Sequence, residues 1–289
     1  MSLGMDATCY LCHFNRNMQT AQALGDEATA TAFARALMAL YLSMPEDASS
    51  PTVAPATNEL FQKFYGLEPD RFRREKEASN AFVLERLERL LALAESAPDP
   101  VLAGAQLAIL GNYLDFSALQ GEVSFEKLDQ MLTQALHMDL PAYPRFRKEL
   151  ETCRRLVYLT DNAGEIGFDR VFARQLRQAF PAMQIVFIVR GGFAQNDATR
   201  ADARQVGLEF PVLDNGNRVP GTELSLLSKE ARQALDQADM IVAKGQGNAE
   251  TLLGCGYPIW YAFLIKCPRF IARFGRPKLT PMLVREGDV

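Results

Sequence analysis

The sequence predicts an α/β protein, with a helical domain over residues 5–150 followed by a mostly parallel sheet, covered by helices, over residues 151–289. Two observations carry this prediction. Six of the 19 glycines lie in the first 150 residues and thirteen in the remainder, as tight strand-to-helix turns in the second half require. The apolar residues also change from helical spacing to short continuous runs near Leu156.

The first half carries apolar residues at the spacing of amphipathic helices. Two such stripes are Phe33, Leu37, Leu40 and Tyr41, and then Val83, Leu87, Leu90, Leu91 and Ala94. We expect two further helices over about residues 101–110 and 125–136. Prolines lie between the first two stripes and cannot continue a helix, so residues 45–51 and Pro55 are predicted to form a loop.

Short apolar runs alternate with helical stretches in the second half. The predicted strands cover residues 156–159, 185–189, 212–213, 240–243 and 259–265. The predicted helices between them cover residues 164–180, 197–206, 228–237 and 248–254. This alternation is typical of βαβ units, which form a mostly parallel sheet with helices on its faces.

The charge balance excludes some classes of partner. Thirty-one Lys and Arg residues stand against 35 Asp and Glu, a net charge of −4, so no global positive field attracts nucleic acid or an anionic membrane. No apolar run approaches the roughly 18 residues of a membrane helix, and the first residues do not resemble a secretion signal. We expect a cytoplasmic protein with five reduced cysteines, and its oligomeric state stays open.

Three junctions that follow predicted strands are rich in carboxylates, amides and glycines. Their residues are 161–165 (Asp-Asn-Ala-Gly-Glu), 190–199 (Arg-Gly-Gly-Phe-Ala-Gln-Asn-Asp-Ala-Thr) and 244–248 (Lys-Gly-Gln-Gly-Asn). Because ligands bind beyond the carboxyl ends of parallel strands, we expect the junctions to converge on one site. Their oxygens suit a divalent metal, and the lysine and glycine-rich helix starts suit a phosphate. Asp161 or Asp197 taken alone is more often just a helix N-cap, and it is the occurrence of Asp-Asn and Asn-Asp pairs beside glycines at two strand ends that favours a site.

These junctions resemble the domain-of-unknown-function-89 family, whose members are also called damage-control or ARMT-like metal-dependent phosphatases. The resemblance extends to Lys266-Cys267, to residues 111–116 (Gly-Asn-Tyr-Leu-Asp-Phe) and to the N-terminal pair Cys9 and Cys12, which resembles the prokaryotic subgroup. It implies an N-terminal helical domain on a Rossmann-like α/β/α domain. It also implies one divalent ion, Mn²⁺, Co²⁺, Ni²⁺ or Mg²⁺, that supports hydrolysis of small phosphorylated metabolites.

The resemblance also assigns roles to residues. The family's metal ligands fall on Asp161, Asn162 and Asp197, and its substrate-contacting segments fall on Glu165, on residues 246–250 and on Lys266. In and beside these segments, the residues expected to bind the substrate are Asn112, Asn196, Gln246, Asn248 and Lys266. Asn112 is equally compatible with a cap at the end of an apolar helix.

The chemistry of the side chains supports the same site. A metal held by two carboxylates and an amide keeps positions open for a phosphate oxygen and for a water that attacks in line. Lys244 or Lys266 is expected to clamp the remaining phosphate oxygens, and Glu165 to orient the water or a substrate hydroxyl. The expected catalytic residues are therefore Asp161, Glu165 and Lys244. A covalent aspartyl-phosphate at Asp161 is the alternative, although Ala163 stands where haloacid-dehalogenase-type enzymes need a second carboxylate.

Two other functions stay open. An S-adenosylmethionine-dependent methyltransferase uses a similar sheet, but it needs a glycine-rich loop after the first strand and an acidic residue after the second, where this chain has Asp161-Asn162 and Arg190. A non-enzymatic, metal-dependent sugar-phosphate-binding protein would use the proposed site without turnover. For Cys9 and Cys12, an accessory metal or redox role is the alternative to simple packing.

Overall fold

A mixed sheet forms the centre of the computed structural model, which describes residues 3–68, 70–119, 122–132 and 134–288. Within these residues the strand order is β3-β2-β1-β4-β5-β6, and every neighbouring pair is parallel except β5 and β6. The strands are β1 Arg155–Leu159, β2 Gln184–Val189, β3 Val212–Asp214, β4 Met240–Lys244, β5 Ile259–Leu264 and β6 Pro281–Arg285. The predicted mostly parallel sheet is confirmed, and β6 is an antiparallel strand that the sequence did not predict.

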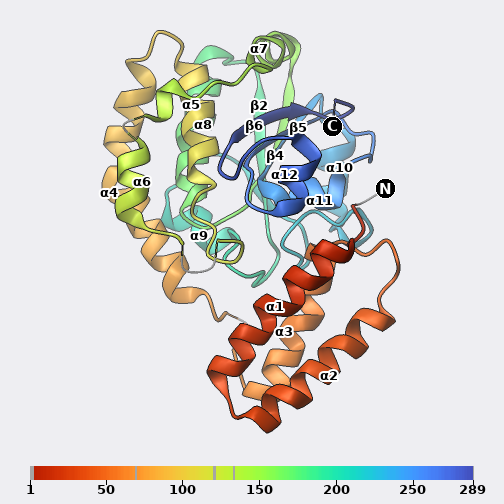
Figure 1. Cartoon of the computed structure of the whole chain (residues 1–289). Coiled ribbons are helices and arrows are strands. Elements are labelled where there is room, and N and C mark those ends of the chain that lie inside the picture. The colour runs from red at the N-terminus through yellow and green to blue at the C-terminus, as the bar shows by residue number, and fades with distance from the viewer. Residues whose placement is uncertain (1–2, 69, 120–121, 133, 289) are drawn as a thin grey trace.

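Helices cover both faces of this sheet, as Figure 1 shows. Alternate strand residues face opposite sides, so Tyr158 and Val242 join one apolar core while Val157 and Ile241 join the other. The first core includes residues of α4 Arg73–Glu95, α5 Pro100–Gly111, α6 Phe125–Leu132, α7 Tyr143–Thr152, α8 Glu165–Ala179 and α9 Arg200–Gln205. The second includes residues of α10 Lys229–Asp236, α11 Gly245–Leu252 and α12 Pro268–Phe274.

Three N-terminal helices form a separate layer, drawn in red and orange in Figure 1. They are α1 Ala7–Leu24, α2 Glu27–Ser43 and α3 Ser50–Tyr65. Their own small core contains Ala21, Phe33, Leu37 and Phe61. Helix α1 contacts α12, and α3 contacts α11, so this layer lies against the end of the sheet where those two helices begin.

The predicted domain boundary at residue 150 stays a prediction. Helices from before this boundary pack in the same apolar core as the sheet that follows it. Helices α4 and α5 precede residue 150, but Leu90 and Leu107 belong to the same apolar core as Tyr158 of β1. Helix α5 runs against α8 closely enough that a Cβ added to Gly104 would lie 3.0 Å from the ring of Phe172. The first half therefore supplies both the separate layer α1–α3 and part of the helical cover of the sheet.

Some predicted boundaries are wrong for local reasons. The predicted loop includes Pro51 and Pro55, yet both lie in α3. Pro51 occupies the first turn, where its missing N–H has no helical partner to lose, and Pro55 removes only one bond of the second turn. The helix predicted over 125–136 ends at Leu132, residue 133 is outside the described part, and residues 135–137 form a short 3₁₀ helix (η1). A second short 3₁₀ helix, η2, covers Leu224–Leu226.

None of the helices in the described part of the chain is long and apolar enough to cross a membrane.

Candidate active site

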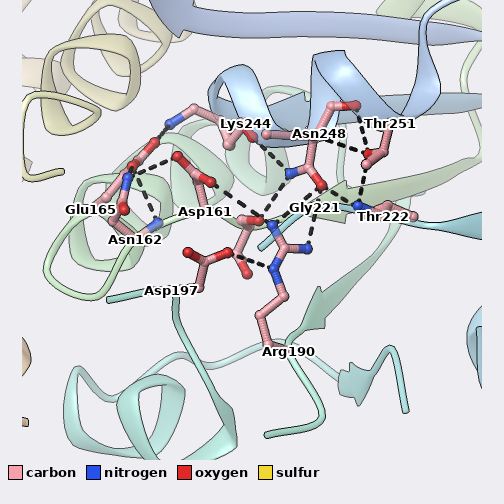
Figure 2. A network of polar contacts seen from close by, with 12 residues as sticks. Asp161, Asn162, Glu165, Arg190, Asp197, Gly221, Thr222, Lys244, Asn248 and Thr251 are labelled. Carbon is pink, nitrogen blue, oxygen red and sulfur yellow. Dashed lines mark hydrogen bonds and ion pairs between the residues drawn. The ribbon is translucent and has the colours of Figure 1, made fainter. Parts of the chain in front are cut away.

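The polar junctions meet beyond the carboxyl ends of the parallel strands. Strands β1, β2 and β4 end at one level, because Leu159 pairs with both Ile188 and Ala243. The chain leaves β1 to one side toward β2 and later returns to the other side as β4, and ligands bind open α/β sheets at such a switch point. Figure 2 shows side chains from these junctions converging there.

Two buried carboxylates, Asp161 after β1 and Asp197 after β2, are the centre of this site. The backbone bridges Asn162 to Asp197, and the N–H of Ala198 donates to the carbonyl of Asp161 at 2.7 Å, which holds the two loops together. Burial, together with the charges of Asp197 and Glu165, raises the pKa of Asp161 well above its ordinary value. Burial also raises the pKa of Asp197 to about 6, although Arg190 opposes that shift. This excess of buried negative charge is what a bound cation would neutralise.

Amide side chains fix the orientation of Asp161. Its Oδ2 accepts hydrogen bonds from Nδ2 of Asn112 at 3.0 Å and from Nδ2 of Asn162 at 2.8 Å. Nδ2 of Asn196 donates to Oδ1 of Asn162 at 2.8 Å, which leaves that carbonyl oxygen one further lone pair. Oδ1 of Asn196 is itself buried and has no hydrogen-bond partner among the residues that the structure describes. The predicted residues Asn112, Asn162 and Asn196 are therefore brought together around the first carboxylate.

Arg190 is a site residue that the sequence analysis did not single out. Its side chain is fully buried, and its Nε donates to Oδ2 of Asp197 at 2.7 Å, while its Nη2 lies 3.8 Å from Oδ1 of Asp161. Oδ1 of Asn248 lies 3.3 Å from both terminal nitrogens and also accepts from the hydroxyl of Thr222 (Figure 2). An arginine directly after a buried strand is the sequence signal that would have identified it, since an arginine is almost never fully buried without a partner.

Lys244 lies behind the carboxylates. Its Nζ donates to Oε1 of Glu165 at 2.6 Å, to Oδ1 of Asp169 at 2.8 Å and to the carbonyl of Ala108 at 2.7 Å. Burial acts to lower the pKa of Lys244, but the charges of Asp169 and Glu165 outweigh it, so the pKa is raised. Glu165 in turn accepts from Nδ2 of Asn162 at 2.7 Å. Lys244 and Glu165 are therefore connected to the two buried carboxylates through Asn162.

A cavity of about 130 Å³ opens at this site. Of the predicted site residues, its lining includes Asp161, Asn162, Asp197, Gln246 and Lys266. The others stand behind these and are not part of the lining: Asn112, Glu165, Asn196, Lys244 and Asn248. Lys266 is thus the lysine that reaches the cavity.

One wall of the cavity comes from the N-terminal layer. Helix α1 contributes Cys9, Cys12 and Arg16 to the lining. Burial raises the pKa of the Cys9 thiol to about 11. Among the described residues, no three His, Cys, Asp or Glu side chains are grouped to hold a metal, so the two cysteines have no such partners for a zinc site.

The two carboxylates and the amide oxygens nevertheless fit a hard divalent cation. Oxygen donors of this kind are the ligands that Mg²⁺ and Mn²⁺ prefer. Burial raises the pKa values of both Asp161 and Asp197, and a bound cation would favour their charged forms. Asn162 carries the third candidate oxygen and is held in place by Glu165 and Asn196.

Known proteins are similar to this chain over a range that includes every residue of the candidate site. A family model described as the damage-control phosphatase ARMT1-like domain matches residues 5–279. A damage-control phosphatase of Pyrococcus horikoshii is 34% identical over 177 residues, which are 60% of this chain and 61% of that protein. A damage-control phosphatase of Archaeoglobus fulgidus is 30% identical over 226 residues, 76% of this chain and 77% of that protein.

The fold is also similar to that of a solved structure over almost the whole chain. The crystal structure of a DUF89 family protein from Pyrococcus horikoshii covers 98% of this chain and 99% of its own, with a TM-score of 0.84 and 26% sequence identity. The assignment of the paired cysteines to a prokaryotic subgroup stays a prediction. Because the family model and the strand-end motifs agree over almost the entire sequence, the chain belongs to the damage-control phosphatase ARMT1-like family, also called DUF89.

Proposed function

We propose that the protein is a metal-dependent phosphomonoester hydrolase that acts on small phosphorylated metabolites such as sugar phosphates or damaged phosphometabolites. Membership of the damage-control phosphatase family supports a phosphatase-type function. The observation that carries the proposal is the pair of buried carboxylates, Asp161 and Asp197, that border one cavity at the switch point of the sheet. Their raised pKa values support cation binding as the purpose of the arrangement.

Asp161, Asn162 and Asp197 are the residues that would hold the cation, with Mn²⁺, Co²⁺, Ni²⁺ and Mg²⁺ as candidates. The bound ion would supply Lewis-acid stabilisation of the phosphoryl oxygens and activation of a water. Arg190 holds the carboxylate of Asp197 in place through its 2.7 Å contact. Glu165 does not line the cavity, and its carboxylate accepts a hydrogen bond from Asn162. It therefore acts in this proposal as a positioning residue.

Lys266 is the candidate to bind the phosphate. It lines the cavity, its Nζ pairs with Oδ2 of Asp115 at 2.8 Å, and its backbone N–H donates to Oε1 of Gln246. An ammonium group has three donor hydrogens, so a phosphate oxygen can bind Nζ while Asp115 keeps its own contact. The contacts of Lys244 with Glu165 and Asp169 support a positioning role for Lys244, in place of the clamp expected from the sequence.

The test is a phosphate-release assay on EDTA-treated protein, before and after each candidate metal is added back. We expect release from p-nitrophenyl phosphate or sugar phosphates only with metal present, because two carboxylates and an amide do not stabilise phosphoryl charge by themselves. Full turnover in metal-free protein would rule the proposal out. Metal-dependent binding of a sugar phosphate without release would favour the non-enzymatic sugar-phosphate-binding protein. The methyltransferase alternative gains no support, since Arg190 stands where its acidic residue is needed.

A further inference from the structure

A second cavity, of about 440 Å³, adjoins the cavity that Asp161 and Asp197 line. Arg16, Ser117 and Gln195 belong to the lining of both cavities. Gln195 has a φ of 53°, a left-handed conformation that residues other than glycine rarely adopt, and such strain clusters at ligand-binding sites. A ligand that extends from the first cavity therefore meets Arg16 at the boundary with the second.

Two arginines line the second cavity, Arg16 on α1 and Arg71 just before α4. Within the described residues neither side chain forms a hydrogen bond or an ion pair, and the Nε atom of each is buried. The terminal nitrogens are not among the buried atoms without a partner, so they are open to solvent. Because arginines in a cavity wall normally pair with an acidic group, these two lack an anion that the described part of the chain does not supply.

The two guanidinium groups are close enough for their charges to repel. Burial and the positive charge of Arg16 lower the pKa of Arg71 to about 10. Arg71 packs on the rings of Phe61 and Phe72, whose centroids lie 4.8 Å and 5.0 Å from its Cζ. Among the described residues of the lining Glu75 is the acidic one, and its Oε2 forms no hydrogen bond with either arginine. Two positive charges against one negative charge leave the cavity suited to an anion, which would relieve the repulsion between the arginines.

We propose that Arg16 and Arg71 bind a second anionic group of the substrate, a carboxylate or a phosphate on the part that leaves when the phosphate ester is cleaved. A guanidinium group donates hydrogen bonds in a planar fork that matches both kinds of anion. The substrate class is therefore a phosphomonoester with a negative charge at each end. The inference rests on the proposed phosphatase function, and it gives the N-terminal layer a part in the choice of substrate.

Three substrates with the same carbon chain test the proposal. Sorbitol 6-phosphate ends in a neutral alcohol, 6-phosphogluconate ends in a carboxylate, and sorbitol 1,6-bisphosphate ends in a second phosphate. Because the chain and its internal hydroxyl groups are the same, differences in kcat/KM among the three report on the terminal group. A preference for the carboxylate or for the bisphosphate identifies which of the two anions the site takes.

The variants change the charge of the second cavity in both directions. Arg16→Met and Arg71→Met remove a positive charge and keep unbranched side chains of similar reach. Arg35→Met on α2 and Arg74→Met on α4 are the matched controls, because each removes the same charge from an exposed position outside both cavities. Glu75→Gln removes the negative charge of the lining. Thermal unfolding shows that each variant is folded, and the two arginine variants test the site independently.

We expect the wild type to prefer 6-phosphogluconate or the bisphosphate to sorbitol 6-phosphate, and each arginine variant to lose about tenfold or more in kcat/KM for the preferred compound. The value for sorbitol 6-phosphate should stay within about twofold, and Glu75→Gln should keep or increase the preference. Equal losses on all three substrates, or a wild type without a preference, would overturn the site. A loss in Glu75→Gln as large as in the arginine variants would also overturn it, because the effect would then come from the packing of the wall and not from its charge.

Binding to EDTA-treated protein separates this inference from the proposed function, which predicts no turnover without metal. Calorimetry with 6-phosphogluconate and with sorbitol 1,6-bisphosphate should show binding that Arg16→Met and Arg71→Met weaken about tenfold or more. A wild-type protein that binds these compounds but releases no phosphate with any metal would contradict the phosphatase proposal. The weaker binding of the variants would in that case still support the anion site. Absent binding in the wild type, or unchanged binding in both variants, would refute it.

Discussion

A Cβ atom on Gly245 would lie 2.0 Å from Oδ2 of Asp161. Gly245 begins α11 directly after β4, and its φ of 76° is a conformation that other residues rarely adopt. The glycine therefore allows α11 to approach the first carboxylate of the candidate metal site. It cannot be replaced without moving the backbone of one strand end or the carboxylate of the other.

We predict that Gly245→Ala displaces Asp161 and abolishes metal binding. The matched control is Gly256→Ala, because Gly256 has a φ of 82° but open space around it. Both variants should lose about 1 kcal/mol of unfolding free energy or more through the unfavourable φ, and Gly245→Ala should lose additional stability through the collision. Thermal unfolding and metal calorimetry check this. Unchanged metal affinity in Gly245→Ala would show that the close approach does not matter to the site.

Lys244 leads to a second prediction, on stability. Removal of its ammonium in Lys244→Met leaves Glu165 and Asp169 buried without their cation, and breaking a buried ion pair from one side costs about 3–5 kcal/mol. Lys278→Met is the control, because Lys278 pairs with Glu122 at the surface, where such pairs contribute about 0–1 kcal/mol. Urea unfolding at pH 7 measures both. Similar values for the two variants would contradict a structural role of the buried lysine.

The sequence predicted that Asp161 and Asp197 lie together, as they do at one cavity, but it did not predict which way the side chain of Lys244 points. Asp161 and Asp197 follow apolar runs, and the rule that ligands bind at the carboxyl ends of parallel strands places them together without further information. Lys244 belongs to β4, and alternation places it on the same face as Val242, which packs in the core shared with α8. Counting that alternation would have directed Lys244 to Glu165 and away from the cavity.

Other features were beyond local reasoning. The wall formed by α1 depends on how a helix near the N-terminus packs against α12, more than 200 residues later, as the contact of Arg269 with Asp6 illustrates. No local pattern encodes that arrangement. Strand β6 was missed because its apolar run is only three residues long, follows a proline and pairs antiparallel at the edge of the sheet, outside the βαβ alternation that identified the other strands.

Glu250 leads to a prediction on pH. Its folded pKa, raised by burial to about 7, lies above the ordinary value of 4.5, so the folded state binds the proton more tightly than the unfolded state. The free-energy cost of ionising the buried carboxyl of Glu250 is absent when the pH is below its ordinary pKa, and it is complete when the pH is above its folded pKa. The stability of the protein therefore falls as the pH rises through this window. Glu250→Gln removes the titration, and the variant should gain stability relative to wild type between pH 5 and pH 8 on the order of 1 kcal/mol or more. A stability difference that does not change with pH would show that Glu250 is not held in a protonated form.

Asp161→Asn tests whether the carboxylate of Asp161 is a metal ligand. The helix-cap interpretation of Asp161 is wrong, because the N-cap of α8 is Gly164 and no side chain caps that helix, while Oδ2 of Asp161 accepts from Asn112 and Asn162. In the structure the carboxylate is buried near Asp197 and Glu165, and these groups raise its pKa. The neutral amide relieves that repulsion, so the metal-free variant should be at least as stable as metal-free wild type.

Metal binding and turnover should change in the opposite direction. The loss of one carboxylate ligand is expected to weaken the metal and to lower turnover about 10²-fold or more, about 3 kcal/mol of transition-state stabilisation. Thermal unfolding with and without metal shows whether the metal still stabilises the variant, and calorimetry and phosphate release measure the two losses. Asp115→Asn is the control for metal affinity alone, because Asp115 lines the same cavity but pairs with Lys266, the candidate phosphate-binding residue. Wild-type metal affinity and wild-type turnover in Asp161→Asn would show that Asp161 is not a metal ligand and remove the main support for the proposed site.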